Sequence, residues 1–207
     1  MNKIAGLILS AGYSSRMGDF KPLLTFGDDS SLKRQINAFQ RAEIKEIYVV
    51  VGHNAEKLIP IIEETEARWI FNPDYDQGMF SSVQAGARKI KDTDCKGFLL
   101  LPVDYPLIRW WVIKAILNKH EKGKTKIIYP CFGGERGHPP LIPAQYIDEI
   151  LNFSGAGGLR QVLIKHEQES LDIEVGDKSI LMDMDTPEDY QTLSRYFKEC
   201  GYQKEEK

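Results

Sequence analysis

Two cations and several small residues lie together near the start of the chain. An apolar run over 4–9 leads into the segment SAGYSSRMG at 10–18, and Lys21 follows closely. Small side chains allow consecutive backbone N–H groups to converge on an anion, and Arg16 and Lys21 add full positive charges. The pattern predicts a phosphate-binding loop at the end of the first strand. The alternative is a surface turn whose two cations are solvated.

The spacing of this loop differs from two common nucleotide-binding motifs. It lacks the GxxxxGK[ST] pattern of P-loop enzymes, and Gly12 and Gly18 do not fit the GxGxxG pattern of dinucleotide folds. The chain also lacks that second pattern followed by an acid about 20 residues later, which disfavours a nicotinamide-dependent oxidoreductase. The loop therefore indicates another kind of phosphate site.

Two carboxylates are the strongest further candidates for chemistry. Asp104 ends the apolar run LLLPVD, and Asp185 lies two residues before Pro187, which can start a helix. Ligands of open α/β sheets bind beyond the carboxyl ends of the strands, so Asp104 is expected at the same edge as the loop. Carboxylate oxygens suit Mg²⁺, which leaves its other positions to water and substrate phosphates. The alternatives are a turn acid for Asp104 and a helix N-cap for Asp185.

A polar connection over 72–82, NPDYDQGMFSS, offers further ligand groups. Gly78 allows close backbone approach, and Ser81 and Ser82 at an expected helix start present hydroxyl and N–H groups to a ribose, a base or a phosphate. A capped helix without a ligand is the alternative.

The histidines carry a weaker signal. His53 and His138 have no partners at metal-ligand spacing, which favours structural or substrate-edge roles. No Ser-His-Asp or Cys-His arrangement can be assembled from the sequence, so nucleophilic catalysis is not indicated.

The composition is typical of a globular protein. The chain has 207 residues, of which 42% are hydrophobic and 28% charged, with a net charge of −3. This charge argues against nucleic acid as a partner, because nucleic-acid binding needs a clustered basic face. The three cysteines are widely spaced, and there is no signal segment and no apolar stretch near the ~20 residues that span a bilayer. We therefore expect a cytoplasmic protein without a membrane anchor.

Apolar runs alternate with helical patterns along the first two thirds of the chain. Runs rich in β-branched residues predict buried strands at 4–9, 47–51, 68–71, 97–101 and 126–129. Helical patterns fill the intervals at 31–41, 54–64, 81–91 and 110–122, with Ser30 or Ser31 as the first cap. The alternation predicts a Rossmann-like three-layer α/β/α fold with a mostly parallel sheet and right-handed crossovers.

The alternation of strand and helix patterns ends after residue 129. The turn-rich segment 131–140 predicts a small hairpin excursion in place of a further strand-helix-strand unit. The elements expected to follow are helices at 144–151 and 159–166, a strand near 170–175 and a helix from 187 to about 200. No linker or internal repeat divides the chain, so we expect one domain over 1–202 and a frayed tail at 203–207.

Six motifs follow one another along nearly the whole chain. They are LSAGYSSRMGxxKPLL at 9–24, VGHNA at 51–55, NPDYDQGMFSSVQAG at 72–86, LPVDYP at 101–106, GERGHPPLIP at 134–143 and DMDTPEDY at 183–190. In this order they resemble the MobA-like NTP transferase family, and within it the molybdenum cofactor cytidylyltransferase branch. Six ordered motifs are more specific than any one loop.

The resemblance implies a reaction and roles for individual residues. A nucleoside monophosphate would pass from an NTP to a phosphate-bearing acceptor, whose phosphate oxygen attacks directly, and pyrophosphate would be released. Arg16 and the loop amides would grip the triphosphate, Lys21 would neutralise charge at the α-phosphate, and Asp104 and Asp185 would hold Mg²⁺. Phosphoryl transfer needs positioning and charge neutralisation more than a protein nucleophile, in keeping with the residues present.

The resemblance also implies which residues are catalytic, which bind the nucleotide and which bind the acceptor. The catalytic residues would be Arg16, Lys21 and Asp104. The nucleotide-binding residues would be Leu9, Ser10, Ala11, Gly12, Ser14, Ser15, Arg16, Lys21, Gly52, Asn72, Gly78, Ser81, Ser82 and Asp104. An anionic acceptor would bind opposite the nucleotide, at Arg136, His138, Gly158 and Arg160.

Two details of the motifs bear on the substrates. Ser10-Ala11-Gly12 is nearer to the A-A-G of the cytidylyl branch than to the G-G pair of the guanylyl branch, so CTP is the favoured nucleotide. The segment SGAGGLR at 154–160 lacks the acid of the related G-D-x-G-x-R pattern. The motifs therefore leave two alternatives for the acceptor. One is molybdopterin cofactor, with a molybdoenzyme as the receiving partner, and the other is a sugar 1-phosphate or another small phospho-acceptor. A non-catalytic nucleotide-binding regulatory protein is the alternative of another class.

Overall fold

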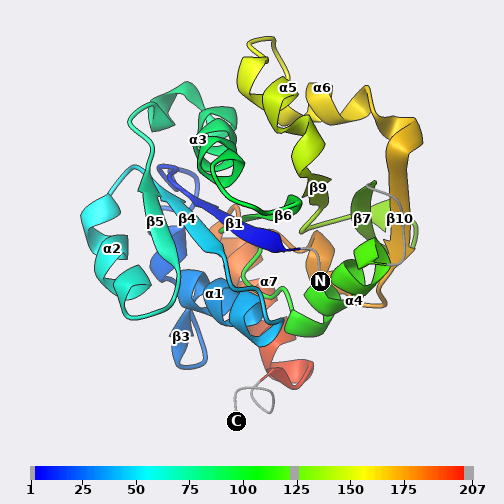
Figure 1. Ribbon diagram of the computed structural model, residues 1–207. Helices are drawn as coiled ribbons and strands as arrows, with labels where there is room; N and C mark the ends of the chain where they lie inside the picture. The colour runs from blue at the N-terminus through cyan, green and yellow to red at the C-terminus, as the bar shows by residue number, and fades with distance from the viewer. Residues whose placement is uncertain (1–2, 122–125, 203–207) are drawn as a thin grey trace.

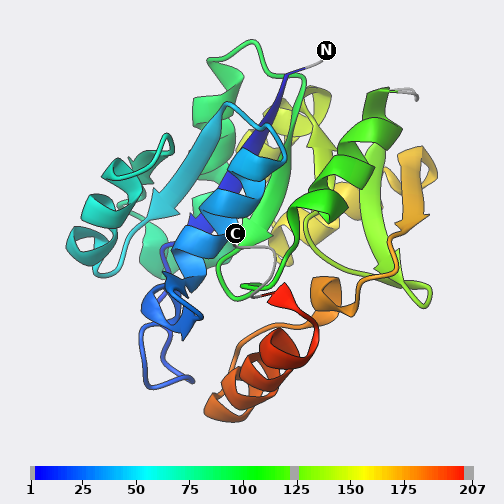
Figure 2. The same ribbon diagram turned by 90° about the horizontal axis from the view of Figure 1, so that it is seen from below.

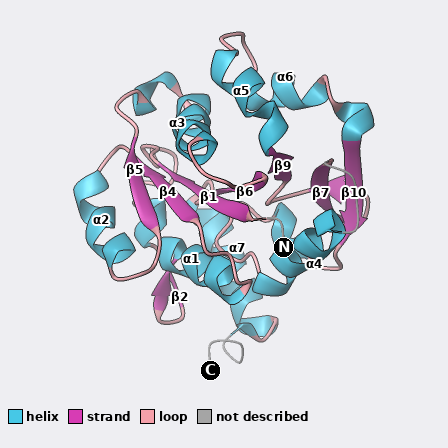
Figure 3. Ribbon diagram, in the orientation of Figure 1, coloured by secondary structure: helices cyan, strands magenta, loops and turns pink. Residues whose placement is uncertain are grey.

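A mixed eight-stranded sheet forms the centre of the computed structural model, which describes residues 3–121 and 126–202. The strands follow the order β10-β7-β9-β6-β1-β4-β5, with β8 attached to β7. Their bounds are β1 (Ile4–Ser10), β4 (Ile47–Val51), β5 (Arg68–Phe71), β6 (Gly97–Pro102), β7 (Ile127–Phe132), β8 (Glu135–Arg136), β9 (Leu141–Pro143) and β10 (Ser170–Glu174). Figure 3 shows the sheet enclosed by helices. The tail expected at 203–207 lies outside the described residues.

Helices cover both faces of the sheet, as the sequence predicts. One face carries α3 (Met79–Lys91), α5 (Ile147–Asn152) and α6 (Gly158–Ile164), and the other carries α1 (Ser31–Arg41), α2 (Ala55–Glu63) and α4 (Trp110–Glu121) (Figure 1). Each face is sealed by its own apolar cluster, because strands buried on both sides alternate their side chains between the two layers. No helix within the described residues is long and apolar enough to cross a membrane.

The parallel strands at the centre end at one edge of the sheet. In β1, Leu9 pairs with Val50 of β4 and with Pro102 of β6, and both pairings are parallel. All residues of these three strands are buried, in keeping with the continuous apolar runs in the sequence. The loops that leave β1, β4 and β6 therefore meet at the same place, which is where ligands bind in such sheets.

The hairpin excursion expected after residue 129 is confirmed. Gly133 and Gly134 turn the chain at φ 61° and 82°, so that β8 returns antiparallel to β7. β9 then lies between β6 and β7 and is antiparallel to both. The strand expected at 126–129 continues through Pro130, whose carbonyl still accepts a hydrogen bond from Gly137 N at 2.8 Å.

A short hairpin was not foreseen from the sequence. β2 (Thr25–Phe26) and β3 (Asp29–Ser30) pair antiparallel after the 3-10 turn η1 (Lys21–Leu23). Each strand has only two residues, too few to produce an alternating pattern. Ser30 at its end is the cap of α1, since Ser30 Oγ accepts from Lys33 N at 3.3 Å, which decides between the two expected caps.

The last helix, α7 (Pro187–Glu199), closes the carboxyl edge of the sheet (Figure 2). A third apolar cluster attaches it to the first half of the chain, and joins Leu193, Phe197 and Tyr202 to Met17 of the first loop and Phe26 of β2. Thr186 caps α7 in a capping box with Asp189, so Asp185 is not the N-cap and its carboxylate is available for other contacts.

We predict that replacing Phe197 by Ala lowers the free energy of unfolding by about 3 kcal/mol or more, the usual loss for a buried Phe. Phe197 is 3% exposed and packs on Phe26 at 6.1 Å between ring centroids. The matched control is Phe71→Ala on the edge strand, where the ring is 50% exposed and the change should stay within about 0.5 kcal/mol. Urea denaturation of the three proteins measures the difference. Equal losses in both variants would contradict an anchoring role of Phe197.

Candidate active site

A cavity of about 290 Å³ lies at the carboxyl ends of β1 and β6. This volume is close to the lower end of the range of ~300–1,000 Å³ for small-molecule sites. The residues lining the cavity include most of the expected nucleotide-binding residues, namely Leu9, Ser10, Ala11, Gly12, Ser14, Arg16, Lys21, Gly78, Ser82 and Asp104, and also Asp185. The structure thus brings together residues that are up to 176 positions apart, from Leu9 to Asp185.

The first loop presents its two cations to one carboxylate. Ser14, at φ 56°, reverses the chain, and its Oγ accepts from Lys21 N at 3.2 Å. Lys21 Nζ then donates to Asp185 Oδ1 at 2.6 Å, and Arg16 lies 2.9 Å from Asp185 Oδ2. Lys21 is only 8% exposed, whereas Arg16 extends into solvent. Lys21 is therefore not a solvated cation of a surface turn, whereas Arg16 is solvated and also paired with Asp185.

Backbone and side-chain contacts fix the position of Asp104 at the end of β6. Val103 N donates to Leu9 O at 3.0 Å, and Met184 N donates to Asp104 O at 2.8 Å. From α1, the buried Gln35 donates to Pro102 O at 2.8 Å and to Tyr105 O at 2.9 Å. The loops that carry the two expected carboxylates are thus joined directly to each other and to β1.

The Asp104 carboxyl lies in an unusual electrostatic environment. Burial raises its pKa to about 6, and the negative charges of Asp185 and Asp183 add to this rise, while the charge of Lys21 opposes it. Its Oδ1 is buried without a hydrogen-bond partner in the described part of the chain. An unsatisfied buried carboxylate oxygen at a cavity is a group that a ligand or cation would stabilise.

The donor set fits a hard divalent cation. Asp104 offers an oxygen without a hydrogen-bond partner among the described residues, and Asp185 offers two oxygens that contact Lys21 and Arg16. Among the described residues, no three His, Cys, Asp or Glu side chains gather where they could hold a metal ion. Two carboxylates with substrate phosphates and water would complete the shell that Mg²⁺ prefers, so the magnesium site stays a prediction that the residues fit.

Asn72 and Ser81 of the 72–82 connection form hydrogen bonds just outside the cavity lining. Asn72 is buried, and its Nδ2 donates to Ser81 Oγ at 2.9 Å and to Ser82 Oγ at 3.0 Å. Ser81 Oγ in turn donates to Asp74 O at 2.7 Å. Asn72 and Ser81 do not line the cavity, whereas Gly78 and Ser82 do. No side chain caps the N-terminus of α3, so Gly78 and Met79 bring an uncapped helix end to the cavity wall.

Two other expected residues lie away from the cavity lining. Ser15 is exposed on the outer part of the loop. Gly52 is buried beneath Tyr75, and a Cβ there would come within 2.6 Å of Tyr75 Cβ. Tyr75 and Met79 are cavity residues that the sequence did not single out, because nothing in the local sequence distinguishes them from ordinary loop and helix residues.

The expected acceptor residues lie around a second hollow. Leu100, Tyr129, Arg136, His138, Leu159 and Arg160 line it, and Gly158 lies beside it at the start of α6. Arg160 is exposed and has no ion-pair partner among the described residues. Its charge is therefore available to an anionic ligand.

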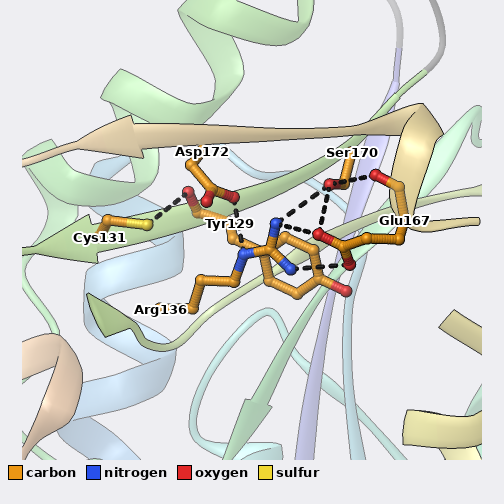
Figure 4. Close-up of polar contacts among 6 residues, drawn as sticks. All are labelled: Tyr129, Cys131, Arg136, Glu167, Ser170 and Asp172. Carbon is orange, nitrogen blue, oxygen red and sulfur yellow. Dashed lines mark hydrogen bonds and ion pairs between the residues drawn. The ribbon is translucent and has the colours of Figure 1, made fainter. Parts of the chain in front are cut away.

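Arg136 is already neutralised by its neighbours (Figure 4). Its guanidinium donates to both Glu167 oxygens at 2.6 and 2.9 Å, to Asp172 Oδ1 at 2.7 Å and to Ser170 Oγ at 3.1 Å. It also lies 4.2 Å above the centre of the Tyr129 ring. These contacts raise the pKa of Arg136 and join β8 to β10, so its geometry is that of a structural residue.

His138 is uncharged in this setting. Burial lowers the pKa of His138 to about 4, and the centroid of its ring lies 4.3 Å from that of the Tyr105 ring. Its Nδ1 is buried without a hydrogen-bond partner in the described residues. His138 therefore offers a neutral imidazole ring, and no positive charge, to an acceptor near neutral pH.

Comparison with known proteins connects this geometry to a family. The chain is 29% identical over 201 residues to the molybdenum cofactor cytidylyltransferase of Escherichia coli, with 96% of this chain and 100% of that protein covered. It is 26% identical over 198 residues to the nicotine blue oxidoreductase of Paenarthrobacter nicotinovorans, with 92% of this chain and 96% of that protein covered.

A solved structure shares the fold. A nucleotidyl transferase from Methanothermobacter thermautotroptrophicus superposes with a TM-score of 0.82 at 19% identity, and 97% of this chain and 100% of that one are covered. This confirms the predicted mostly parallel α/β fold. The model of the MobA-like NTP transferase domain matches residues 6–170, and the chain belongs to this nucleotidyltransferase family.

Proposed function

We propose that this protein transfers CMP from CTP to the terminal phosphate of a molybdopterin-type acceptor with the help of Mg²⁺. The observation that carries the proposal is the cavity in which Lys21 and Arg16 face Asp185 beside the unsatisfied Asp104. Cations for a triphosphate and carboxylates for a metal occur there together. The nearest support from sequence is the identity with the cytidylyltransferase of Escherichia coli.

The reaction requires one bond to form and one to break. An oxygen of the acceptor phosphate attacks the α-phosphorus of CTP, the bond from that phosphorus to the β-phosphate oxygen breaks, and pyrophosphate leaves. Bound Mg²⁺ would neutralise negative charge on the triphosphate. Lys21, held by Asp185 and largely buried, adds a fixed positive charge that needs no reorganisation as the transition state forms.

Both hollows border the same strand, β6, which favours transfer between ligands bound in them. β6 contributes Leu100 to the acceptor hollow and Pro102 to the nucleotide cavity, two positions apart in one strand. The rise of ~3.3 Å per strand residue makes this separation roughly 7 Å. A phosphate bound beyond Leu100 can therefore approach a triphosphate beyond Pro102 without a domain movement.

Pyrophosphate release tests the proposal. We expect release with CTP, Mg²⁺ and molybdopterin, little release without the acceptor, and a lower kcat/KM with GTP. Sugar 1-phosphates serve as the competing acceptors. Incubation with NADH or NADPH examines the oxidoreductase class that one relative suggests. NTP binding without turnover on any acceptor, or nicotinamide oxidation without pyrophosphate release, would contradict the proposal.

The carboxyl of Asp104 gives a prediction about pH. Its pKa in the folded, metal-free protein is raised above the unfolded value of ~3.9, so the folded state binds the proton more tightly and loses stability as pH rises through about 6. We expect Asp104→Asn to raise the Tm at pH 8 and to leave it nearly unchanged at pH 4. Added Mg²⁺ with CTP should stabilise the wild type and not the variant, and turnover should fall by roughly 100-fold or more.

Asp183→Asn is the matched control, because Asp183 is exposed and lies two residues from Asp185. It should show no comparable pH-dependent gain in Tm. A similar gain in both variants would mean that general acidity of this edge, and not the burial of Asp104, sets the stability.

The acceptor hollow gives a prediction that separates two arginines. Arg160→Ala should lower kcat/KM for the acceptor roughly tenfold while leaving the Kd of CTP and the Tm unchanged, because Arg160 is exposed and unpaired among the described residues. Arg136→Ala should lower the Tm, because Glu167 and Asp172 lose their shared cation. Steady-state kinetics and thermal melts measure both variants. A weaker CTP affinity in Arg160→Ala would place this arginine at the nucleotide instead.

A further inference from the structure

The walls of the nucleotide cavity contain two chemically different groups of side chains. One group, which we call the charged group, consists of Arg16, Lys21, Asp104 and Asp185, while a fifth charged residue, Asp76, lines the cavity next to Tyr75. The other, which we call the apolar rim, consists of Tyr13, Tyr75 and Met79. A nucleoside triphosphate has the same two parts, a polyanionic tail and a flat heterocycle. The proposed reaction uses the charged group and leaves the apolar rim without a role.

Tyr13 in the rim is both exposed and held in place. Its ring is 52% exposed, yet its centroid lies 4.7 Å from that of His53 and 5.5 Å from that of Tyr75. His53 is itself fixed, because His53 N donates to Ala11 O at 3.1 Å in the loop that carries Tyr13. A ring already packed on one side loses little conformational entropy when a ligand covers the other.

Close packing at Gly52 keeps Tyr75 in the rim. A Cβ at Gly52 would lie 2.6 Å from Tyr75 Cβ and 2.7 Å from its Cγ, distances that real side chains do not reach. Any larger residue there would displace Tyr75 and with it one of the two supports of Tyr13. Gly52 thus acts on the cavity without lining it.

Met79 completes the rim from α3. Its side chain is 60% exposed, the largest exposed fraction among the described large hydrophobic residues. Gly78 before it has φ 97°, a conformation that favours glycine and turns the chain into the helix at the cavity wall. The flexible thioether of Met79, which lines the same cavity as Tyr13 and Tyr75, can adapt its shape to a planar ligand.

We propose that Tyr13 is the surface on which the base of the nucleotide stacks, so that the apolar rim makes affinity depend on the presence of a base. This inference rests on the proposed function and assigns the base to the rim and the phosphates to the charged group. Stacking on an aromatic ring is available to every base, because each has a π-face. Tyr13 therefore contributes to binding of any nucleotide and leaves the choice among bases to polar contacts.

The test compares a nucleotide with its base-free counterpart. Binding of CTP and of inorganic tripolyphosphate, each with Mg²⁺, is measured by calorimetry for the wild type, Tyr13→Ala and Tyr13→Phe. We expect Tyr13→Ala to raise the Kd of CTP roughly tenfold and to change the Kd of tripolyphosphate by less than about twofold, since removing a stacked ring weakens only base binding. Tyr13→Phe keeps the ring and should bind CTP like the wild type.

Trp69→Ala is the control, because Trp69 is an exposed aromatic on β5 outside the cavity lining and its loss should change neither Kd. Equal weakening of CTP and tripolyphosphate by Tyr13→Ala would show that Tyr13 holds the loop, and would overturn the inference while the proposed function stands. An unchanged Kd of CTP, or a loss in Tyr13→Phe as large as in Tyr13→Ala, would overturn it as well. A wild type that binds neither compound would overturn both the inference and the proposed function.

Discussion

The ion pairs of Asp185 with Lys21 and Arg16 join the end of the chain to its beginning. The residues are 164 and 169 positions apart, and the pairs form only because α7 returns to the carboxyl edge of the sheet. Apolar packing makes that return favourable, since Met17, Phe26 and Phe197 share one cluster. Apolar packing therefore brings Asp185 to this edge, and the ion pairs form as a consequence. A buried Lys without its carboxylate would be unfavourable, so the cluster and the ion pair depend on each other.

The same edge is electrostatically unfavourable without a ligand. Asp104 is largely withdrawn from solvent beside two like charges, and the charge of Lys21 offsets them in part. The unpartnered oxygen of Asp104 and its raised pKa are two consequences of one arrangement, in which the folded protein holds negative charge in excess of its nearby cations. A divalent cation bound by these carboxylates would reduce this excess of negative charge. Functional sites commonly lower the stability of the ligand-free folded protein in this way, because their groups are arranged for the ligand-bound state.

Sequence reasoning succeeded where a local pattern determines a local outcome. The apolar runs predicted the strands, a serine at 30 or 31 predicted the start of α1, and the loop of small residues lies in the cavity wall. It did not succeed where a role depends on a distant partner. The sequence shows Arg136 only as a cation, but Glu167 and Asp172 neutralise it once β8 and β10 pair with the two edges of β7 and the Arg136 side chain extends over Tyr129. Asn72 likewise reads as a ligand group, but its amide is used by two serines.

The two hollows are built from parts of the fold that differ in how strictly their geometry is fixed. The nucleotide cavity is built at the ends of the central parallel strands, whose register is fixed by burial on both faces. The second hollow is built from the hairpin excursion and the α5–α6 region, where the strands are short and antiparallel and the connections glycine-rich. Changes there alter the shape and charge of the hollow without disturbing the strand register. Under the proposed function, the lining of the second hollow, with Arg160 as its unpaired cation among the described residues, is therefore the part of the chain that we expect to select the acceptor.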